Sequence, residues 1–107
     1  MDYGDSEAIA NATGENTAAV IIEAIQGESG VIVPPKNYLK EVEAICCENN
    51  VLLILDEVQT GFGRTGEMFA YELFGIKPDI MTIAKAFGGG YPIGGFLATD
   101  EVANALW

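Results

Sequence analysis

The sequence predicts an α/β fold in which helices flank a mostly parallel β-sheet, and two observations support this class. Continuous apolar runs of strand length occur at residues 18–22 and 51–55, and residues 80–84 are apolar except for Thr82. Such runs are typical of strands buried on both faces of a sheet. Residues 36–50 instead repeat their apolar side chains at helical spacing. Strands alternating with helices indicate a parallel α/β layer, and 107 residues leave room for one domain.

The N-terminal half is expected to contain the first strand and the longest helix. A small, polar lead-in with about one turn of helix comes first, then a strand, a glycine-containing loop and a short apolar stretch that prolines stop. These are expected at residues 6–12, 18–22, 26–30, 31–33 and Pro34-Pro35. The helix at 36–50 ends at Asn49-Asn50 and presents one apolar face. That face comprises Leu39, Val42, Ile45 and Cys46.

The C-terminal half begins with the strongest strand signal of the chain, five consecutive aliphatic residues at 51–55. A glycine-rich loop follows, and after it we expect a short aromatic helix and two more strands. These lie at residues 67–74, 80–84 and 93–99. Asp100 is a suitable N-cap for a last helix that runs to Trp107.

Composition excludes several classes of function. The chain has 16 Asp and Glu against 5 Lys and Arg, a net charge of -11, so binding to nucleic acid or to an anionic membrane surface is not expected. It contains no histidine, which removes His-ligated metal sites and Ser-His-Asp catalysis, and we expect no metal. No apolar run reaches the roughly 20 residues of a membrane span. Cys46 and Cys47 are adjacent, so we expect half-buried free thiols and a reduced, cytoplasmic setting.

Two charged residues directly follow strands of the predicted sheet: Asp56 after 51–55 and Lys85 after 80–84. Ligands of parallel sheets bind beyond the carboxyl ends of the strands, so both side chains should lie in one crevice. One interpretation is a structural salt bridge or two solvated loop ends. The other is a nucleophilic lysine that forms a Schiff base, with Asp56 as the partner that the pyridinium of pyridoxal phosphate requires.

A competing pattern lies in the loop between them. Residues 61–66, Gly-Phe-Gly-Arg-Thr-Gly, match G-x-G-x-x-G, and Asp79 follows at about the distance of a ribose-binding acid. Polar residues separate the strand from the first glycine, however, and no long helix opens on Gly66. A dinucleotide-binding oxidoreductase therefore stays an alternative, while a loop that needs tight turns explains the glycines better. The Gly88-Gly89-Gly90 turn lacks the Lys-Ser/Thr of a P-loop.

Three stretches carry a resemblance to a known family. They are Glu-Ala-Ile-Gln-Gly-Glu at 23–28, Leu-Asp-Glu-Val-Gln-Thr-Gly-Phe-Gly-Arg-Thr-Gly at 55–66, and Pro-Asp-Ile-Met-Thr-Ile-Ala-Lys-Ala-Phe-Gly-Gly-Gly-Tyr-Pro-Ile-Gly at 78–94. In this order and spacing, from about residue 17 onward, the chain resembles the class-III aminotransferases, which include the acetylornithine, ornithine and 4-aminobutyrate enzymes. The resemblance implies a fold-type-I, pyridoxal-phosphate-dependent transferase. It also implies that 61–66 is a conformational loop.

The resemblance implies roles for individual residues. Lys85 matches the lysine that forms the Schiff base with the cofactor and moves the proton, and Asp56 matches the partner of the pyridine nitrogen. Val58 matches the residue packed on the ring face, and Gln59 the residue near its phenolic oxygen. Glu28 matches a glutamate that gates substrates by holding an active-site arginine in ω-amino enzymes. The implied reaction moves an amino group from an amine or (ω-)amino acid donor to a 2-oxo acid acceptor.

Members of this family are several times longer. The resemblance therefore implies that residues 1–107 are part of the large, cofactor-binding domain, without the N-terminal part and the small C-terminal domain. We expect a homodimer or higher oligomer, and negligible turnover by this stretch alone. A catalytically inactive, self-associating fragment of the same fold is the second alternative.

Overall fold

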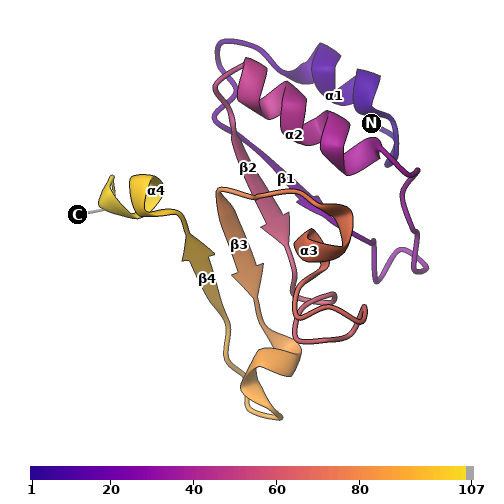
Figure 1. Cartoon of the computed structure of the whole chain (residues 1–107), viewed down its shortest axis with the longest axis vertical. Helices are drawn as coiled ribbons and strands as arrows, with labels where there is room; N and C mark the ends of the chain where they lie inside the picture. Colours follow the sequence, from indigo (N-terminus) through magenta and orange to yellow (C-terminus); the bar gives the residue numbers. More distant parts are fainter. Residues whose placement is uncertain (106–107) are drawn as a thin grey trace.

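The structure, a computed structural model, describes residues 1–105 and contains one mixed four-stranded sheet in the order β1-β2-β3-β4 (Figure 1). The strands β1, β2 and β3 are mutually parallel, and β4 runs antiparallel to β3. Their bounds are Ala19–Glu23, Leu52–Asp56, Ile80–Ile83 and Gly95–Ala98. The predicted α/β class with a mostly parallel sheet is confirmed.

The register of the parallel strands decides what lies at their carboxyl ends. Glu23 of β1 pairs with Asp56 of β2, and Asp56 pairs with Thr82 of β3. Because residues in register project to the same face of a sheet, these polar side chains form a row across three strands. The row marks the edge of the sheet where ligands of parallel sheets bind.

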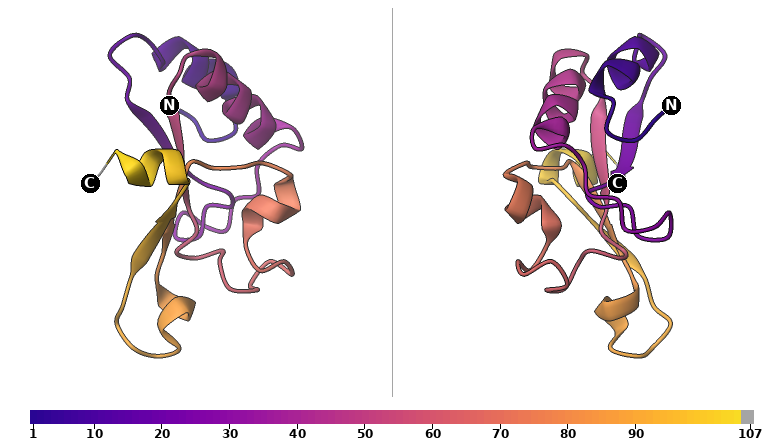
Figure 2. Two further views of the ribbon diagram at one scale, coloured as in Figure 1. Left: turned by 60° about the vertical axis from the view of Figure 1, so that its left-hand side comes forward. Right: turned by 90° about the vertical axis from the view of Figure 1, so that its right-hand side faces the viewer.

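Within residues 1–105, five helical segments connect or flank the strands. They are α1 (Ser6–Ala12), α2 (Tyr38–Glu48), α3 (Ala70–Phe74), the 3₁₀ turn η1 (Lys85–Gly88) and α4 (Asp100–Asn104). Figure 2 shows α2 and α3 on the same side of the sheet, and α1 packs beside α2. One face of the sheet is therefore covered by helices.

The hydrophobic core lies between this covered face and α2. Leu53 and Leu55 of β2 are buried there, and Met81 and Ile83 of β3 are buried on the same face of the sheet. On the opposite face, Ile21 of β1 is 65% exposed and Phe96 of β4 is 59% exposed. The remaining buried apolar residues are Ile9, Ala24, Tyr38, Leu39, Val42, Cys46, Val51, Ala70 and Ile76.

Two local expectations were wrong. The aromatic helix begins at Ala70 instead of residue 67, because the buried Glu57 carboxylate accepts the backbone N–H groups of Ala70 and Tyr71 and fixes the first turn there. The N-cap of α4 is Thr99, whose hydroxyl accepts from the Val102 backbone N–H. Asp100 is instead its first residue, and the predicted end at Trp107 lies outside the described residues.

The cysteines also differ from expectation. Cys46 is buried and Cys47 is exposed, because adjacent helical positions point about 100° apart. Burial raises the pKa of the Cys46 thiol, with Asp79 and Glu43 adding to the shift. The apolar stretch at 31–33 forms an isolated bridge between Gln26 and Ile32. Within residues 1–105, no helix has the length and apolar character needed to span a membrane.

Candidate active site

Asp56, the last residue of β2, is half-buried at the carboxyl edge of the sheet. Its Oδ1 accepts hydrogen bonds from the Val58 backbone N–H (3.0 Å) and from the Thr82 hydroxyl (3.3 Å). Among residues 1–105, no donor reaches Oδ2. The chain thus fixes one oxygen of this carboxylate and leaves the other able to accept a proton donor from a ligand.

Val58 and Gln59 lie in the turn that follows β2, both half-buried. The loop containing Gly27 packs closely on Gln59, since a Cβ at Gly27 would lie 2.8 Å from the Gln59 Cγ. Only glycine allows this approach without displacing the Gln59 side chain. The contact brings the loop after β1 over the turn after β2.

Lys85 begins η1, with its backbone in the left-handed region at φ 50°. Its Nζ lies 3.7 Å from Glu28 Oε1, and the two side chains are 47% and 86% exposed. Exposed pairs of this kind contribute little to stability, about 0–1 kcal/mol. Glu28, predicted to gate substrates by holding an arginine, therefore lies beside the predicted cofactor lysine in this structure.

The structure brings these residues to one edge in two groups. Lys85 pairs with Glu28, while Asp56 contacts Val58 and Thr82. Lys85 follows Thr82 by three residues, a chain length of at most about 11 Å. Asp56 and Lys85 make no direct hydrogen bond or ion pair in the described chain. The simple salt bridge considered from the sequence is therefore wrong, and both groups remain available to a ligand between them.

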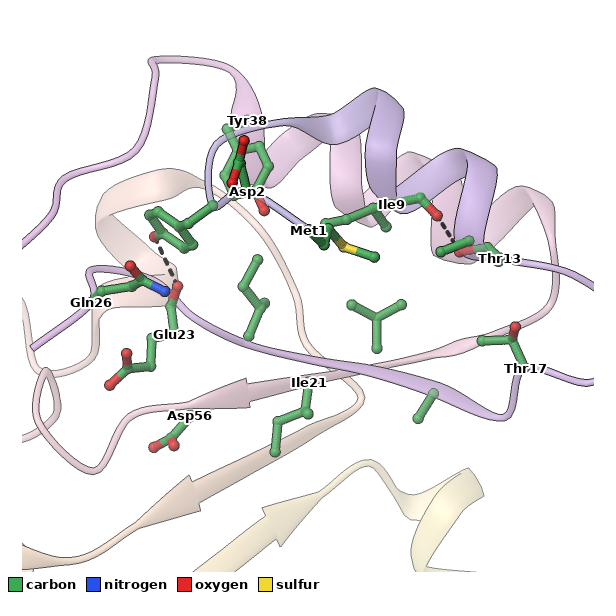
Figure 3. A pocket seen from close by; sticks show the side chains of 15 residues that line it. Met1, Asp2, Ile9, Thr13, Thr17, Ile21, Glu23, Gln26, Tyr38 and Asp56 are labelled. Carbon is green, nitrogen blue, oxygen red and sulfur yellow. Dashed lines mark hydrogen bonds between the residues drawn. The ribbon is translucent and has the colours of Figure 1, made fainter. Parts of the chain in front are cut away.

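A groove beside β1 was not predicted. It runs between the N-terminal segment and β1, and Figure 3 shows Glu23 and Asp56 at one end of it. Tyr3 fixes the N-terminal segment there, because its hydroxyl donates to the backbone oxygens of Glu23 (2.9 Å) and Ala24 (2.8 Å). Burial strongly raises the pKa of Tyr3, and the neighbouring Tyr38 and Glu23 add to this.

Glu57 is the main residue that the sequence analysis missed. It is fully buried, on the opposite side of β2 from Asp56, and its carboxylate accepts from the Thr60 hydroxyl (2.7 Å) and two backbone N–H groups. These belong to Ala70 (2.7 Å) and Tyr71 (3.2 Å), at the start of α3. A second acid directly after Asp56 was a signal, since alternation along a strand turns adjacent side chains to opposite faces.

The loop at 61–66 does not have the geometry of a dinucleotide site. No long helix opens on Gly66, since the next helix is the five-residue α3 beginning at Ala70. Asp79 Oδ2 accepts a hydrogen bond from the Leu53 backbone N–H at 2.8 Å. This carboxylate therefore holds the start of β2 beside the residue that precedes β3. Separately, no group of three or more His, Cys, Asp or Glu among residues 1–105 is arranged to hold a metal ion.

Comparison with known proteins agrees with the resemblance. Residues 4–107 match the family model described as aminotransferase class-III. The chain is 64% identical to an acetylornithine aminotransferase of Methanothermobacter thermautotrophicus over 99% of its own length and 27% of that protein. It is 60% identical to a putrescine aminotransferase of Pectobacterium atrosepticum over 89% of its own length and 20% of that protein.

A solved structure has the same arrangement. The ornithine delta-aminotransferase of Plasmodium falciparum superposes on 100% of this chain with a TM-score of 0.94 and 44% sequence identity, using 28% of its own length. The chain thus spans about a quarter of the length of the relatives that it matches.

Proposed function

This chain belongs to the class-III aminotransferase family, and from this premise we propose that it forms the central part of the cofactor site of a transaminase. The family implies pyridoxal phosphate as the cofactor. The observation that carries the proposal is the row of strand ends at which Asp56 keeps one carboxylate oxygen without a protein donor. Lys85 follows the neighbouring strand at the same edge.

The residues present fit this cofactor. A carboxylate held by Thr82 and by its own turn has the fixed orientation that is needed to accept a hydrogen bond from a ring nitrogen. The Lys85 amine is partly exposed and within reach of a molecule lying over the strand ends. When bound, pyridoxal phosphate carries the amino group between substrates and withdraws electrons from the reacting carbon.

Each side chain then has a separate task. Asp56 Oδ2 would accept a hydrogen bond from the protonated ring nitrogen and so keep that nitrogen charged, and Val58 would pack on one ring face. Gln59, against which the Gly27 loop packs closely, would donate an amide N–H to the phenolic oxygen. Lys85 Nζ would hold the cofactor covalently and, once released, would be the group that moves a proton at the reacting carbon.

The class of amino donor follows from the relatives. The names of the matched proteins specify acetylornithine, ornithine and putrescine, molecules that share a primary amine at the end of a short carbon chain. We propose such an amine as the donor and a 2-oxo acid as the acceptor. Glu28, which contacts Lys85 here, is free to exchange that contact for an arginine or a charged substrate because it is 86% exposed.

The same proposal includes assembly with further chain. Each outer strand, β1 and β4, has one unpaired edge in the described part. Ile21 of β1 and Phe96 of β4 also expose apolar surface on one face of the sheet. Natural proteins cover such edges and patches. We propose that residues 1–107 belong to the large domain of a longer enzyme that forms a dimer or higher oligomer.

The test is covalent labelling of the purified chain with pyridoxal phosphate and borohydride, followed by peptide mass spectrometry. We expect the label on Lys85 in preference to Lys36, Lys40 and Lys77, because Lys85 directly follows β3 at the edge that carries Asp56. Asp56→Asn should abolish the preference. Glu23→Gln, a carboxylate change one strand away in register, is the matched control and should preserve it.

Equal labelling of all lysines, or a preference for Lys85 that survives Asp56→Asn, would contradict the proposed roles. Steady-state transamination by this stretch alone is not expected, and its detection would show that the site is more complete than we propose.

A further inference from the structure

An aromatic stack connects the loop after β2 to the turn that begins with Lys85. The ring of Phe62 stacks on that of Phe87 with centroids 5.5 Å apart and planes 27° apart. Phe62 also meets Phe69 edge-on at 5.1 Å, and Phe69 stacks on Tyr71 of α3 at 6.1 Å. A continuous row of rings therefore extends from α3 to the lysine turn.

The backbones of Phe62 and of Lys85, the first residue of the turn that carries Phe87, are in an unfavourable conformation. Phe62 has φ 60° and Lys85 has φ 50°, and residues with a Cβ adopt this left-handed region only where their surroundings hold them. The hydrogen bonds of η1 are local, from Phe87 to Ala84 and from Gly89 to Ala86. The turn that carries Lys85 thus has few other fixed partners, and the stack is a long-range contact that holds it.

We propose that Phe62 is a positioning residue that acts through Phe87 to fix the lysine turn and so the direction of the Lys85 amine. Its biological importance rests on the proposed function, in which Lys85 holds the cofactor. The positioning itself concerns only residues of this chain and is testable without cofactor. An aromatic pair shifts a local equilibrium by about two- to tenfold. This effect is at least as large as that of the exposed Lys85–Glu28 ion pair.

Trace acetylation measures this positioning directly. The chain is treated with a small amount of labelled acetic anhydride at a series of pH values, then fully acetylated when unfolded, so that mass spectrometry gives a rate for each lysine. In Phe62→Leu and in Phe87→Leu, we expect the Lys85 rate to change by about two- to fivefold, the size of an exposed ion pair. Lys36, Lys40 and Lys77 should keep their rates.

Three control variants make the result specific. Phe62→Tyr keeps a ring and should behave as the unmodified chain, and Phe96→Leu removes an exposed ring outside the stack and should also have no effect. Glu28→Gln should change the Lys85 rate in the same direction as Phe62→Leu. Combining the two should add nothing further, because both remove the same approach of Lys85 to Glu28.

Two results would overturn the proposal. One is an unchanged Lys85 rate and pH profile in both leucine variants. The other is an equal change at all lysines in both variants, which would mean that the rings only stabilise the fold. Failure of the cofactor proposal is recognised separately, as pyridoxal phosphate labelling that spreads over all lysines while the acetylation effect of Phe62→Leu persists.

Discussion

Replacing Glu57 by glutamine tests how the turn that follows Asp56 is held to the start of α3. The change keeps the shape of a fully buried side chain and removes its charge. The amide can still accept from Thr60 and Ala70, whose hydrogen bonds both end on Oε1. At Oε2, however, an NH₂ group would face the Tyr71 backbone N–H, so that two donors point at each other.

The expected cost follows from these contacts. Loss of one hydrogen bond to a charged group costs about 1.5–3 kcal/mol, and an orphaned buried N–H is part of that cost. Glu57→Ala would orphan three donors and create a cavity, for a cost of about 4–6 kcal/mol. Small domains have a stability of about 5–15 kcal/mol, so glutamine is the informative change and alanine leaves little folded protein.

Urea unfolding followed by circular dichroism measures the difference. At a typical dependence of about 1–3 kcal/mol per molar urea, a loss of 2 kcal/mol lowers the midpoint by about 1 M. Glu72→Gln is the matched control, because Glu72 accepts from the Phe69 backbone N–H near the same helix start at 3.4 Å but is exposed. That variant should lose less than about 0.5 kcal/mol.

Equal midpoints for Glu57→Gln and the unmodified chain would refute this reasoning, as would equal losses in the two glutamine variants. In the first case the buried carboxylate is not the anchor of α3. In the second case its burial contributes nothing beyond an ordinary helix contact.

Two further predictions concern stability. Gly61→Ala should cost about 1–3 kcal/mol because its Cβ would lie 2.8 Å from the Glu57 backbone oxygen, whereas Gly14→Ala, with open space around it, should be neutral in the same urea assay. Stability should also fall as pH rises from about 8.5, the pKa of an unfolded thiol, because burial raises the pKa of Cys46 and of Tyr3 in the folded chain. Both groups favour folding while protonated, and the advantage is lost once the unfolded chain ionises. Cys46→Ala should remove the part of the fall in stability that begins near pH 8.5. Urea midpoints that stay constant across the alkaline range would contradict the raised pKa values of Cys46 and Tyr3.

Much of the fold could be read from local pattern. The largely apolar runs located β1, β2 and β3 to within one residue, because strands inside a parallel sheet are rich in apolar side chains. The spacing of Leu39, Val42 and Cys46 placed α2, because a helix with one buried face repeats its apolar residues every three or four positions. The start of α3 could not be predicted, since it depends on Glu57, which is thirteen residues earlier than Ala70 in the sequence.

The candidate site divides in the same way. The order of residues along the chain was sufficient to place Asp56 and Lys85 at one sheet edge, because parallel strands bring their carboxyl ends together. It could not indicate that Thr82 holds Asp56, or that Glu28 meets Lys85, since these contacts join segments 26 and 57 residues apart.

The sequence by itself determined the α/β class, the family and the identities of the residues that follow each strand. Tertiary structure alone decided which oxygen of Asp56 stays without a protein donor, which acid is buried beneath it, and which ring lies against the lysine turn. The physical reason is that the spacing of apolar residues along a segment indicates which of its faces packs against the core. Register and loop packing, by contrast, are fixed only when distant segments exclude water together.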